Sequence, residues 1–397
     1  MLQTIPDHVP ASVVREFDFF RQPELLENPH DAVGSVFADL EPRILFTPYN
    51  GGHWVVGGYD ELLAAFRDVK TFSSTTMQIP TMTEEPKLIP LNLDPPEHTN
   101  FRAPLATALR PERVHPLEPE IRTLTRQLIG EIQAAGEGNF VSAISEPLPI
   151  YIFLRIVGVP PEKFRQFRDH VKQYLSNPAD RSENSARFDE ELEQLIRDKI
   201  DQPADDLLST LIGSEIGGRR PTFAELMGYC RLLMLAGLDT VTNAMSFGMR
   251  HLAIDQALQK DLRENPERVP LAVEELLRRY SFANLGRICL RDTELHGLQF
   301  RKGDRVLLML AGGGLDPATF PEPETVHIDR QGKAQPAFGF GKHHCVGVHL
   351  ARLELKVLYQ EWLSAIPQFR IKKDTTPHFH AGVVIGIEEL QLDWATR

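Results

Sequence analysis

Cysteine is scarce in this chain of 397 residues, which contains only Cys230, Cys289 and Cys345. Three cysteines so far apart do not make a disulfide framework, and they indicate a reducing compartment. No apolar run approaches the roughly 18 residues that a bilayer-spanning helix needs, so we expect no membrane anchor. The segment Met1–Asp7 has neither the basic nor the apolar stretch of a secretory signal. We therefore expect a cytoplasmic protein.

Basic charge is also in short supply. Lysine and arginine number 43 against 55 aspartates and glutamates, for a net charge of −12. With no long basic run, a nucleic-acid partner is not expected. A hydrophobic content of 42% and a charged content of 25% are typical of a globular protein with a large core. Length alone allows two or three domains, but no repeat or linker divides the chain.

Helical periodicity dominates the pattern that is present. Apolar residues spaced three and four apart predict a helix from Leu117 to Ile132, and a charged segment predicts another over 188–200. A capping-box sequence at Thr222–Glu225 opens a segment that we expect to run as one buried helix to about Ile254. Strand-like stretches are expected at roughly 40–60, 288–310 and 382–394, with an irregular proline-rich region near 77–97. The fold class is therefore mainly α with a smaller β portion.

Cys345 lies in the glycine-punctuated run Phe338–Gly347, directly before a strongly periodic helical segment. Gly341 and Gly347 can adopt backbone angles, and admit a flat ligand, that other residues cannot. A helix starting after the cysteine would favour the thiolate, which acts as a metal ligand or a nucleophile. A buried structural cysteine is the plainer alternative. A zinc site lacks four suitably spaced ligands, and no base or acyl site marks a catalytic thiol.

Other polar residues form patterns that have both plain and functional interpretations. Glu275 and Arg278 share a helix face and, taken alone, predict a surface ion pair worth under about 1 kcal/mol. In the run Ala236–Thr240, the Thr240 hydroxyl can bond to the Ala236 carbonyl and loosen the helix, while Gly237 leaves space for a ligand. A solvent-facing polar stripe is the alternative, because Asn243 follows one turn later. Three basic residues could each be a solvated charge when considered alone, but together they can hold two carboxylates. They are Arg102, Arg287 and His343.

Taken in order, these motifs resemble those of the cytochrome P450 family of haem-thiolate monooxygenases. The haem-binding signature of that family is similar to Phe338-x-x-Gly341-x-His343-x-Cys345-x-Gly347, with histidine where arginine is commoner. Glu275-x-x-Arg278 resembles the family's helix pair, and Ala236–Thr240 its oxygen-activating stretch. The likeness extends along nearly the whole chain to the bacterial camphor hydroxylase group, for example at Asp94-Pro95-Pro96-Glu97. The resemblance therefore implies one cytochrome P450 domain over residues 1–397.

The resemblance implies a role for each motif. The cofactor would be haem b, with Cys345 as the axial iron ligand. Asp239 and Thr240 would deliver protons during dioxygen activation, so that a substrate C–H bond is hydroxylated with O2. Glu275 and Arg278 would be structural. The expected contacts with the haem and its propionates come from Arg102, Arg287, His343, Phe338, Gly341 and Gly347.

Three departures from the camphor hydroxylases concern the substrate and the cofactor. No tyrosine lies between Tyr59 and Tyr151, and Pro86 falls near the place where the camphor-anchoring tyrosine is expected. The lost hydrogen bond is worth roughly 0.5–1.5 kcal/mol, so we expect another substrate than camphor. Leu285 replaces an acid near a propionate, and His344 beside the cysteine is unusual.

The residues that the resemblance assigns to the substrate pocket are apolar. They favour a small terpenoid or norisoprenoid, and an ionone-like ketone before camphor. The expected pocket residues are Leu88, Leu91, Leu232, Leu235, Ala236, Ala283, Val383 and Val384.

Electrons must come from outside, because the sequence shows no flavin domain and no CxxC cluster. The resemblance implies a [2Fe–2S] ferredoxin fed by an NAD(P)H-dependent ferredoxin reductase. The residues expected to form a cationic docking face for it are Lys333, Lys342, His344, Arg352 and Lys356. The alternatives are a peroxide-driven or isomerising haem-thiolate enzyme, which has no need of Asp239 and Thr240, and a haem sensor without turnover.

Overall fold

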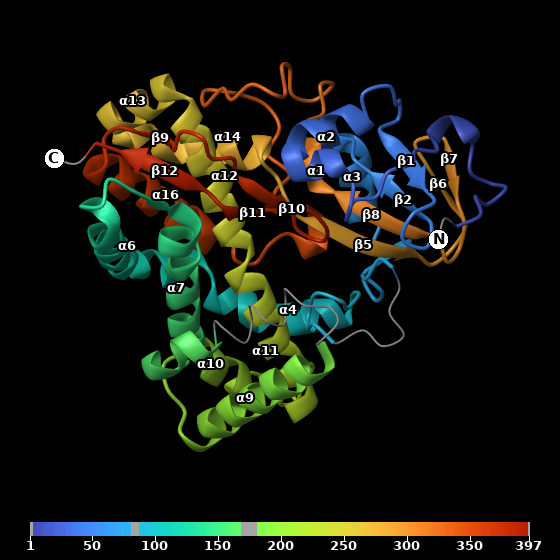
Figure 1. The fold of residues 1–397 in the computed structure, drawn as a ribbon. Helices are drawn as coiled ribbons and strands as arrows, with labels where there is room; N and C mark the ends of the chain where they lie inside the picture. The colour runs from blue at the N-terminus through green and yellow to red at the C-terminus, as the bar shows by residue number, and fades with distance from the viewer. Residues whose placement is uncertain (1–2, 81–86, 168–180, 396–397) are drawn as a thin grey trace.

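The computed structural model describes residues 3–80, 87–167 and 181–395. It shows a helical body with smaller β-sheets, as predicted (Figure 1). The α-helices are α1 (Pro23–Glu27), α2 (Pro29–Val36), α3 (Tyr59–Arg67), α4 (Glu97–Ala108), α5 (Pro111–Val114), α6 (Glu118–Gln133), α7 (Pro147–Val157), α9 (Arg181–Asp201), α10 (Leu207–Gly213), α11 (Phe223–Leu238), α12 (Thr240–Ile254), α13 (Gln256–Glu264), α14 (Val269–Arg279), α15 (Leu310–Gly314) and α16 (Val348–Ala365).

The largest sheet has the strand order β1-β2-β8-β5-β3, in which β2 and β8 are parallel and the other neighbours antiparallel. Smaller sheets pair β10 with β11, β4 and β9 with β12, and β6 with β7. The strands are β1 (Ile44–Thr47), β2 (His53–Val56), β3 (Phe72–Ser73), β4 (Glu137–Asn139), β5 (Asn284–Cys289), β6 (Thr293–Leu295), β7 (Leu298–Phe300), β8 (Arg305–Met309), β9 (Phe369–Ile371), β10 (His378–His380), β11 (Gly386–Glu389) and β12 (Gln391–Trp394).

The three predicted β-rich stretches are confirmed in outline. Gly297 and Gly303 interrupt the middle one with φ values of 84° and 97°, which only glycine adopts readily. The predicted limits were too narrow, because β5 begins at Asn284 and β10 precedes Gly382. Strands β3, β4 and β9 were not predicted. Each is only two or three residues long and is defined by a distant partner rather than by its own pattern.

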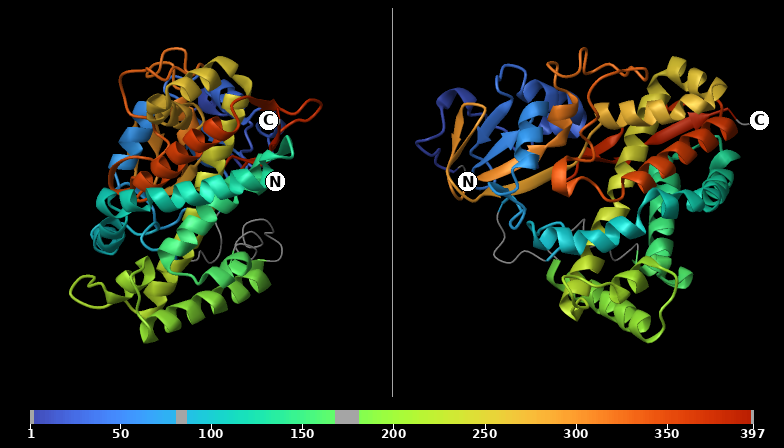
Figure 2. Two further views of the ribbon diagram at one scale, coloured as in Figure 1. Left: turned by 90° about the vertical axis from the view of Figure 1, so that its left-hand side faces the viewer. Right: turned by 180° about the vertical axis from the view of Figure 1, so that it is seen from behind.

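The prediction of one unbroken helix from Phe223 to about Ile254 was wrong. Helix α11 ends at Leu238, and α12 begins at Thr240, with Asp239 between them at φ −101°. The predicted local loosening is confirmed, because the Thr240 hydroxyl donates to the Ala236 carbonyl at 2.9 Å. The views in Figures 1 and 2 show α11 and α12 following one another through the middle of the molecule, with α9 and α10 at one end.

Two further helix predictions are confirmed with adjusted ends. Helix α6 occupies Glu118–Gln133, and Gly136 follows it at φ 73°. Helix α9 begins at Arg181, before the predicted residue 188. The capping box is present, since the Thr222 hydroxyl accepts from the Glu225 amide and the Glu225 carboxylate from the Thr222 amide.

One cluster of buried apolar side chains extends from β1 and β2 through α12 and α16 to β12. It connects the helical and the β-rich parts of the molecule. Within the described residues, no helix is long and apolar enough to cross a membrane.

Candidate active site

The loop that carries Cys345 is shaped by glycines. Gly341 has φ 67°, and a Cβ there would lie 3.0 Å from the Phe66 carbonyl oxygen, so glycine is required. Gly339, which was not singled out from the sequence, has φ 65°. Gly347 does not use the left-handed region, since its φ is −84°. Its backbone N–H instead bonds to the sulfur of Cys345, just before α16 begins.

The electrostatic surroundings of Cys345 are mixed. Burial raises the pKa of the thiol, while the Gly347 N–H and the charges of Arg102 and Arg352 act in the opposite direction. The N–H at the helix start therefore acts in the predicted direction, towards the thiolate, but burial outweighs it. A metal cation at the sulfur would supply the missing stabilisation, because a coordinated thiol is deprotonated.

Phe338 supports the loop from both its backbone and its ring. Its carbonyl accepts the Cys345 N–H at 2.9 Å. Its ring centroid lies 6.3 Å from that of His344 and 5.1 Å from the guanidinium carbon of Arg352. The ring therefore packs beside the cysteine loop, as the resemblance implies.

The three predicted cations converge near this loop, together with His98, which the sequence analysis missed. The rings of His98 and His343 lie 4.1 Å apart, and the Arg102 guanidinium donates to the His344 carbonyl. Arg287, on β5, is only 2% exposed. The interpretation of Arg287 as a solvated charge is therefore wrong. No ion pair joins these four side chains to a carboxylate in the part of the chain that the structure describes.

Burial and mutual repulsion lower the pKa values of this cluster. Burial, Arg287, His98 and Arg102 bring the pKa of His343 to about 2. Burial and Arg102 bring that of His98 to about 4, and burial lowers that of Arg287 to about 10. His98 also has a buried Nδ1 without a hydrogen-bond partner. Such a cluster fits a ligand with two carboxylates, and the i,i+4 spacing of His98 and Arg102 on α4 is the sequence signal for it.

Asp239 and Thr240 lie at the junction of α11 and α12, and the polar stripe there turns inward. Asn243 is 1% exposed, and its side-chain amide donates to the Asp239 carboxylate at 3.2 Å. Burial raises the pKa of Asp239, while His380 and the bond from Asn243 lower it less. The solvent-facing alternative is therefore wrong, and burial holds the pKa of the Asp239 carboxyl above its ordinary value.

Gly237 serves helix packing rather than ligand space. A Cβ at this position would lie 2.5 Å from the Phe153 ring of α7. The expectation that Gly237 opens room for a ligand is therefore wrong, because the Phe153 ring already fills that room.

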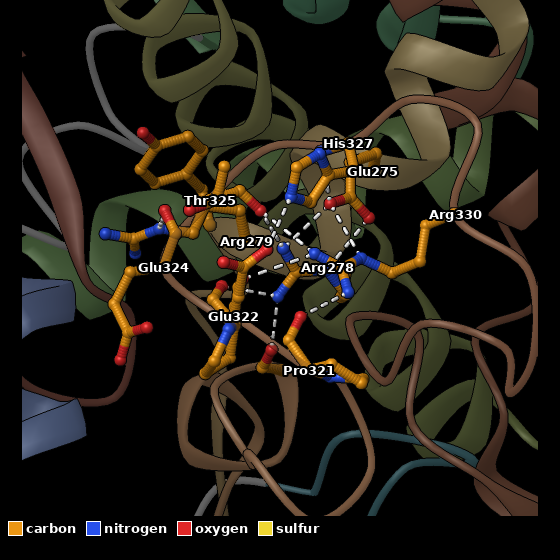
Figure 3. A network of polar contacts seen from close by, with 12 residues as sticks. Glu275, Arg278, Arg279, Pro321, Glu322, Glu324, Thr325, His327 and Arg330 are labelled. Carbon is orange, nitrogen blue, oxygen red and sulfur yellow. Dashed lines mark hydrogen bonds and ion pairs between the residues drawn. The ribbon is translucent and has the colours of Figure 1, made fainter.

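Glu275 and Arg278 are not a surface pair, since their side chains are 5% and 1% exposed. Figure 3 shows them at the centre of a polar network. Two bonds of 2.8 Å join the guanidinium to the carboxylate, which also accepts from the His327 N–H and from Arg330. Burial opposes ionisation of Glu275, but these donors outweigh it and lower its pKa. The other N–H groups of Arg278 donate to the carbonyls of Gly314, Pro323 and Thr325.

The expected pocket residues lie on three segments. Leu232 and Leu235 of α11 are partly exposed, while Leu233 and Met234 on its other side belong to the core. The turn that carries Leu88 and Leu91 is tied to the same helix, since the Ile89 N–H donates to the Gly228 carbonyl. An isolated bridge joins Ala283 to Val384, and Ala236 and Val383 are exposed. Pro86 lies outside the described residues, and Leu285 is partly exposed on β5.

The expected cationic docking face is largely paired with carboxylates. Arg352 makes two bonds to Glu274, at 2.5 and 2.8 Å, and Lys356 bonds to Glu118 at 2.8 Å. Lys333 bonds to Asp60 at 2.6 Å. Lys342 is exposed, and His344 is partly buried. Sequence reasoning identified the cations but not their acidic neighbours, which lie on other elements.

Comparisons with known proteins agree with this geometry. The family model described as Cytochrome P450 matches residues 145–380. The chain is 36% identical over 405 residues to the probable cytochrome P450 127A1 of Sinorhizobium fredii, covering 98% of this chain and 97% of that protein. The crystal structures of CYP101J2 and CYP101C1 are each 34% identical, with TM-scores of 0.91 and 0.92, covering 99% of this chain and 100% of theirs. The chain therefore belongs to the cytochrome P450 family of haem-thiolate monooxygenases.

Proposed function

We propose that Cys345 is the axial ligand of the haem iron and that the buried cation cluster holds the propionates. The observation that carries this assignment is the meeting of a buried thiol, with an N–H at its sulfur, and four basic side chains that form no ion pair with a carboxylate of the described residues. Arg102, Arg287, His343 and His98 would hold the two carboxylates by charge-assisted hydrogen bonds. Phe338, Gly341 and Gly347 would shape the loop against the cofactor. The whole of residues 1–397 would act as one domain.

Asp239 and Thr240 are proposed to control proton delivery. The haem, when bound, supplies the dioxygen chemistry and the cleavage of the substrate C–H bond. The Thr240 hydroxyl donates its hydrogen bond to the Ala236 carbonyl. Its oxygen lone pairs are therefore free to accept a further hydrogen bond. Asp239, one residue away with a raised pKa, can take up a proton and release it. Glu275 and Arg278 would take no part beyond fixing the chain before the cysteine loop.

The substrate is proposed to be a small terpenoid or norisoprenoid, with an ionone-like ketone favoured over camphor. Support comes from α11, whose Leu232 and Leu235 present an apolar side that the core does not use. Exposed apolar side chains at Ala236 and Val383 extend this character. Such a pocket holds its ligand by shape and by burial of apolar surface, which contributes roughly 25 cal/mol of binding free energy per Å² buried.

A [2Fe–2S] ferredoxin, reduced by an NAD(P)H-dependent reductase, is proposed as the electron donor. The exposed Lys342 and the paired side chains of Arg352 and Lys356 lie in the same two segments, the cysteine loop and α16. A docking partner there would approach the thiol side of the proposed haem. Carboxylates on the ferredoxin would compete with Glu274 and Glu118 for these cations.

Reconstitution tests the whole assignment. The purified haem protein is titrated with ionones, camphor and other terpenoids, and the shift from low to high spin is recorded. We expect the largest shift with an ionone-like ketone, followed by a hydroxylated product when ferredoxin, reductase and NADH are added. Camphor as the tightest ligand would contradict the substrate proposal.

The Thr240→Ala variant tests the proton assignment separately. We expect it to consume NADH while releasing less product, because proton delivery becomes unproductive. Unchanged coupling of NADH to product would contradict the role of Thr240. It would also favour the peroxide-driven alternative.

A further inference from the structure

Three elements meet at Gly386, the first residue of β11. His380 of β10 is its direct cross-strand neighbour. A Cβ built on Gly386 would lie 2.2 Å from Cε1 of the His380 ring and 2.3 Å from Oδ1 of Asn243 on α12. The imidazole and the amide therefore occupy the space where any side chain at 386 would go. Glycine at this position brings a histidine from a β-hairpin against the α11–α12 junction.

Asn243 connects this meeting point to Asp239. Its Nδ2 donates to the Asp239 carbonyl at 3.0 Å and to the carboxylate Oδ1 at 3.2 Å. Its Oδ1 accepts the Ile387 N–H at 3.2 Å. These bonds fix the amide with its donor end toward Asp239 and its acceptor end toward β11, on the side of His380.

Two carboxyl groups on different elements interact with His380, those of Glu388 and Asp239. Its Nε2 would be 2.5 Å from a Cβ on Gly386, and Oδ1 of Asn243 would be 2.3 Å from the same Cβ. Its Nδ1 has no hydrogen-bond partner and lies 3.7 Å from the Glu388 carboxylate of β11. The Asp239 carboxyl at the helix junction interacts with His380 by charge. Burial of that carboxyl raises its pKa, and His380 is the first influence that lowers it.

We propose that His380 is a positioning residue for Asp239, holding a positive charge behind the Asn243–Asp239 pair that favours the ionised carboxylate. The hairpin of β10 and β11 would thus adjust the readiness of Asp239 to accept a proton. This inference rests on the proposed role of Asp239 in proton delivery, although the charge interaction itself does not depend on turnover.

An infrared titration of the ferric holoenzyme tests it without catalysis. The carboxylic acid band of Asp239 is assigned by its loss in Asp239→Asn, and its midpoint is followed against pH. In His380→Gln we expect the midpoint to move upward by about one pH unit, because a nearby opposite charge is lost. In His380→Lys, which keeps a positive charge to higher pH, the midpoint should return to the wild-type value or below.

The chain offers a matched control on the same strand. His378 also faces a glutamate, with Nδ1 3.4 Å from Glu389, and its side chain is 66% exposed. His378→Gln should leave the Asp239 midpoint unchanged. An equal shift in His378→Gln and His380→Gln would overturn the proposal, as would a wild-type midpoint in His380→Gln.

The outcome also separates this inference from the proposed function. The reduced carbon monoxide spectrum and the substrate-induced spin shift should be the same in the wild type and both His380 variants. If these spectra are normal and the midpoint does not move, His380 is only structural and the monooxygenase assignment stands. If His380→Gln fails to fold, His380→Lys against wild type decides alone. If the Asp239 midpoint of His380→Lys lies above that of the wild type, His380 does not act on Asp239 through its charge.

Discussion

Two buried carboxyl groups of this molecule, those of Glu275 and Asp239, differ in how completely their hydrogen bonds are satisfied. At the network of Glu275 and Arg278, five hydrogen bonds use every N–H of the guanidinium. At Asp239, an amide and a histidine behind it oppose burial only in part, and the pKa stays raised. The first site lowers the pKa of its carboxyl and the second raises it.

In the proposed mechanism, this difference separates a structural ion pair from a carboxyl that transfers protons. A carboxylate with a full set of donors is locked in one charge state and fixes the chain segments that supply the donors. A carboxyl with too few donors can change its charge at modest cost. The fully paired site ties α14 to the segment of Gly314–Arg330, and the underpaired site lies where two helices break.

Removing the charge of Glu275 should give the largest effect. In Glu275→Gln the buried Arg278 loses its counter-charge, and we expect the free energy of unfolding to fall by about 3–5 kcal/mol. Because the fold lowers the pKa of Glu275, this contribution is present above the ordinary pKa of glutamate and is lost as the pH falls through the lowered value. Urea unfolding followed by circular dichroism measures it.

The control is an exposed pair in α9. Glu193 lies 3.6 Å from Arg197, and both side chains are about half exposed. Glu193→Gln should change the free energy of unfolding by less than about 0.5 kcal/mol. Equal stabilities of Glu275→Gln and Glu193→Gln would contradict the view that the buried network holds the fold.

Glu354 of α16 extends the comparison to a carboxyl with no partner at all. Both of its oxygens are buried without a hydrogen bond, and burial raises its pKa well above the usual value. Stability of the wild type therefore decreases as the pH rises from the ordinary pKa of glutamate toward the raised one. Glu354→Met should remove this slope and stabilise the protein at pH 8 by about 1–3 kcal/mol.

Glu361 on the same helix provides the opposite case. It accepts hydrogen bonds from Arg122 and Arg126. Glu361→Met should therefore destabilise the protein, measured by thermal unfolding between pH 5 and 8. If Glu361→Met stabilised the protein, or Glu354→Met destabilised it, the number of hydrogen-bond partners of the carboxyl would not decide the change in stability.

The smallest expected effect is at Asn243. Asn243→Ala removes a donor from Asp239, so the pKa of Asp239 should rise further. The acid limb of the pH profile for product formation should then move upward by less than about one pH unit. Ser246→Ala, one turn along α12, removes bonds to Ser145 and Thr242 but none to Asp239. The Ser246→Ala variant should leave the acid limb of the pH profile unchanged. If both variants shift the acid limb equally, the effect comes from loosening of α12 and not from Asp239.

The sequence predicts those features whose signals are local. Glycine spacing before Cys345, the i,i+3 pair of Glu275 and Arg278, and the Thr240 hydroxyl four residues after Ala236 each depend on residues in one turn or one loop. The structure confirms the left-handed backbone of Gly341, the contact between Glu275 and Arg278, and the bond from Thr240. It does not confirm the surface position of the pair or a special backbone at Gly347. The roles of these residues at the haem stay predictions.

Features that depend on distant partners could not be predicted in this way. Strand β12 pairs with β4, from the first half of the chain, and with β9, neither of which has a strand pattern of its own. His380 and Asn243 come together at Gly386 only because β10 and β11 form a hairpin against α12. The burial that raises the pKa of the Cys345 thiol has a similar origin, because it comes from the whole fold rather than from the local helix end.

The carboxylate pairing of Arg352 and Lys356 has a consequence for how the protein meets an electron donor. A surface whose cations are already neutralised releases few counterions when an acidic partner arrives. Docking of the proposed acidic electron donor at this surface would be an exchange of one carboxylate for another rather than a net gain of attraction. Electron transfer to this enzyme should therefore tolerate a wide range of ionic strength.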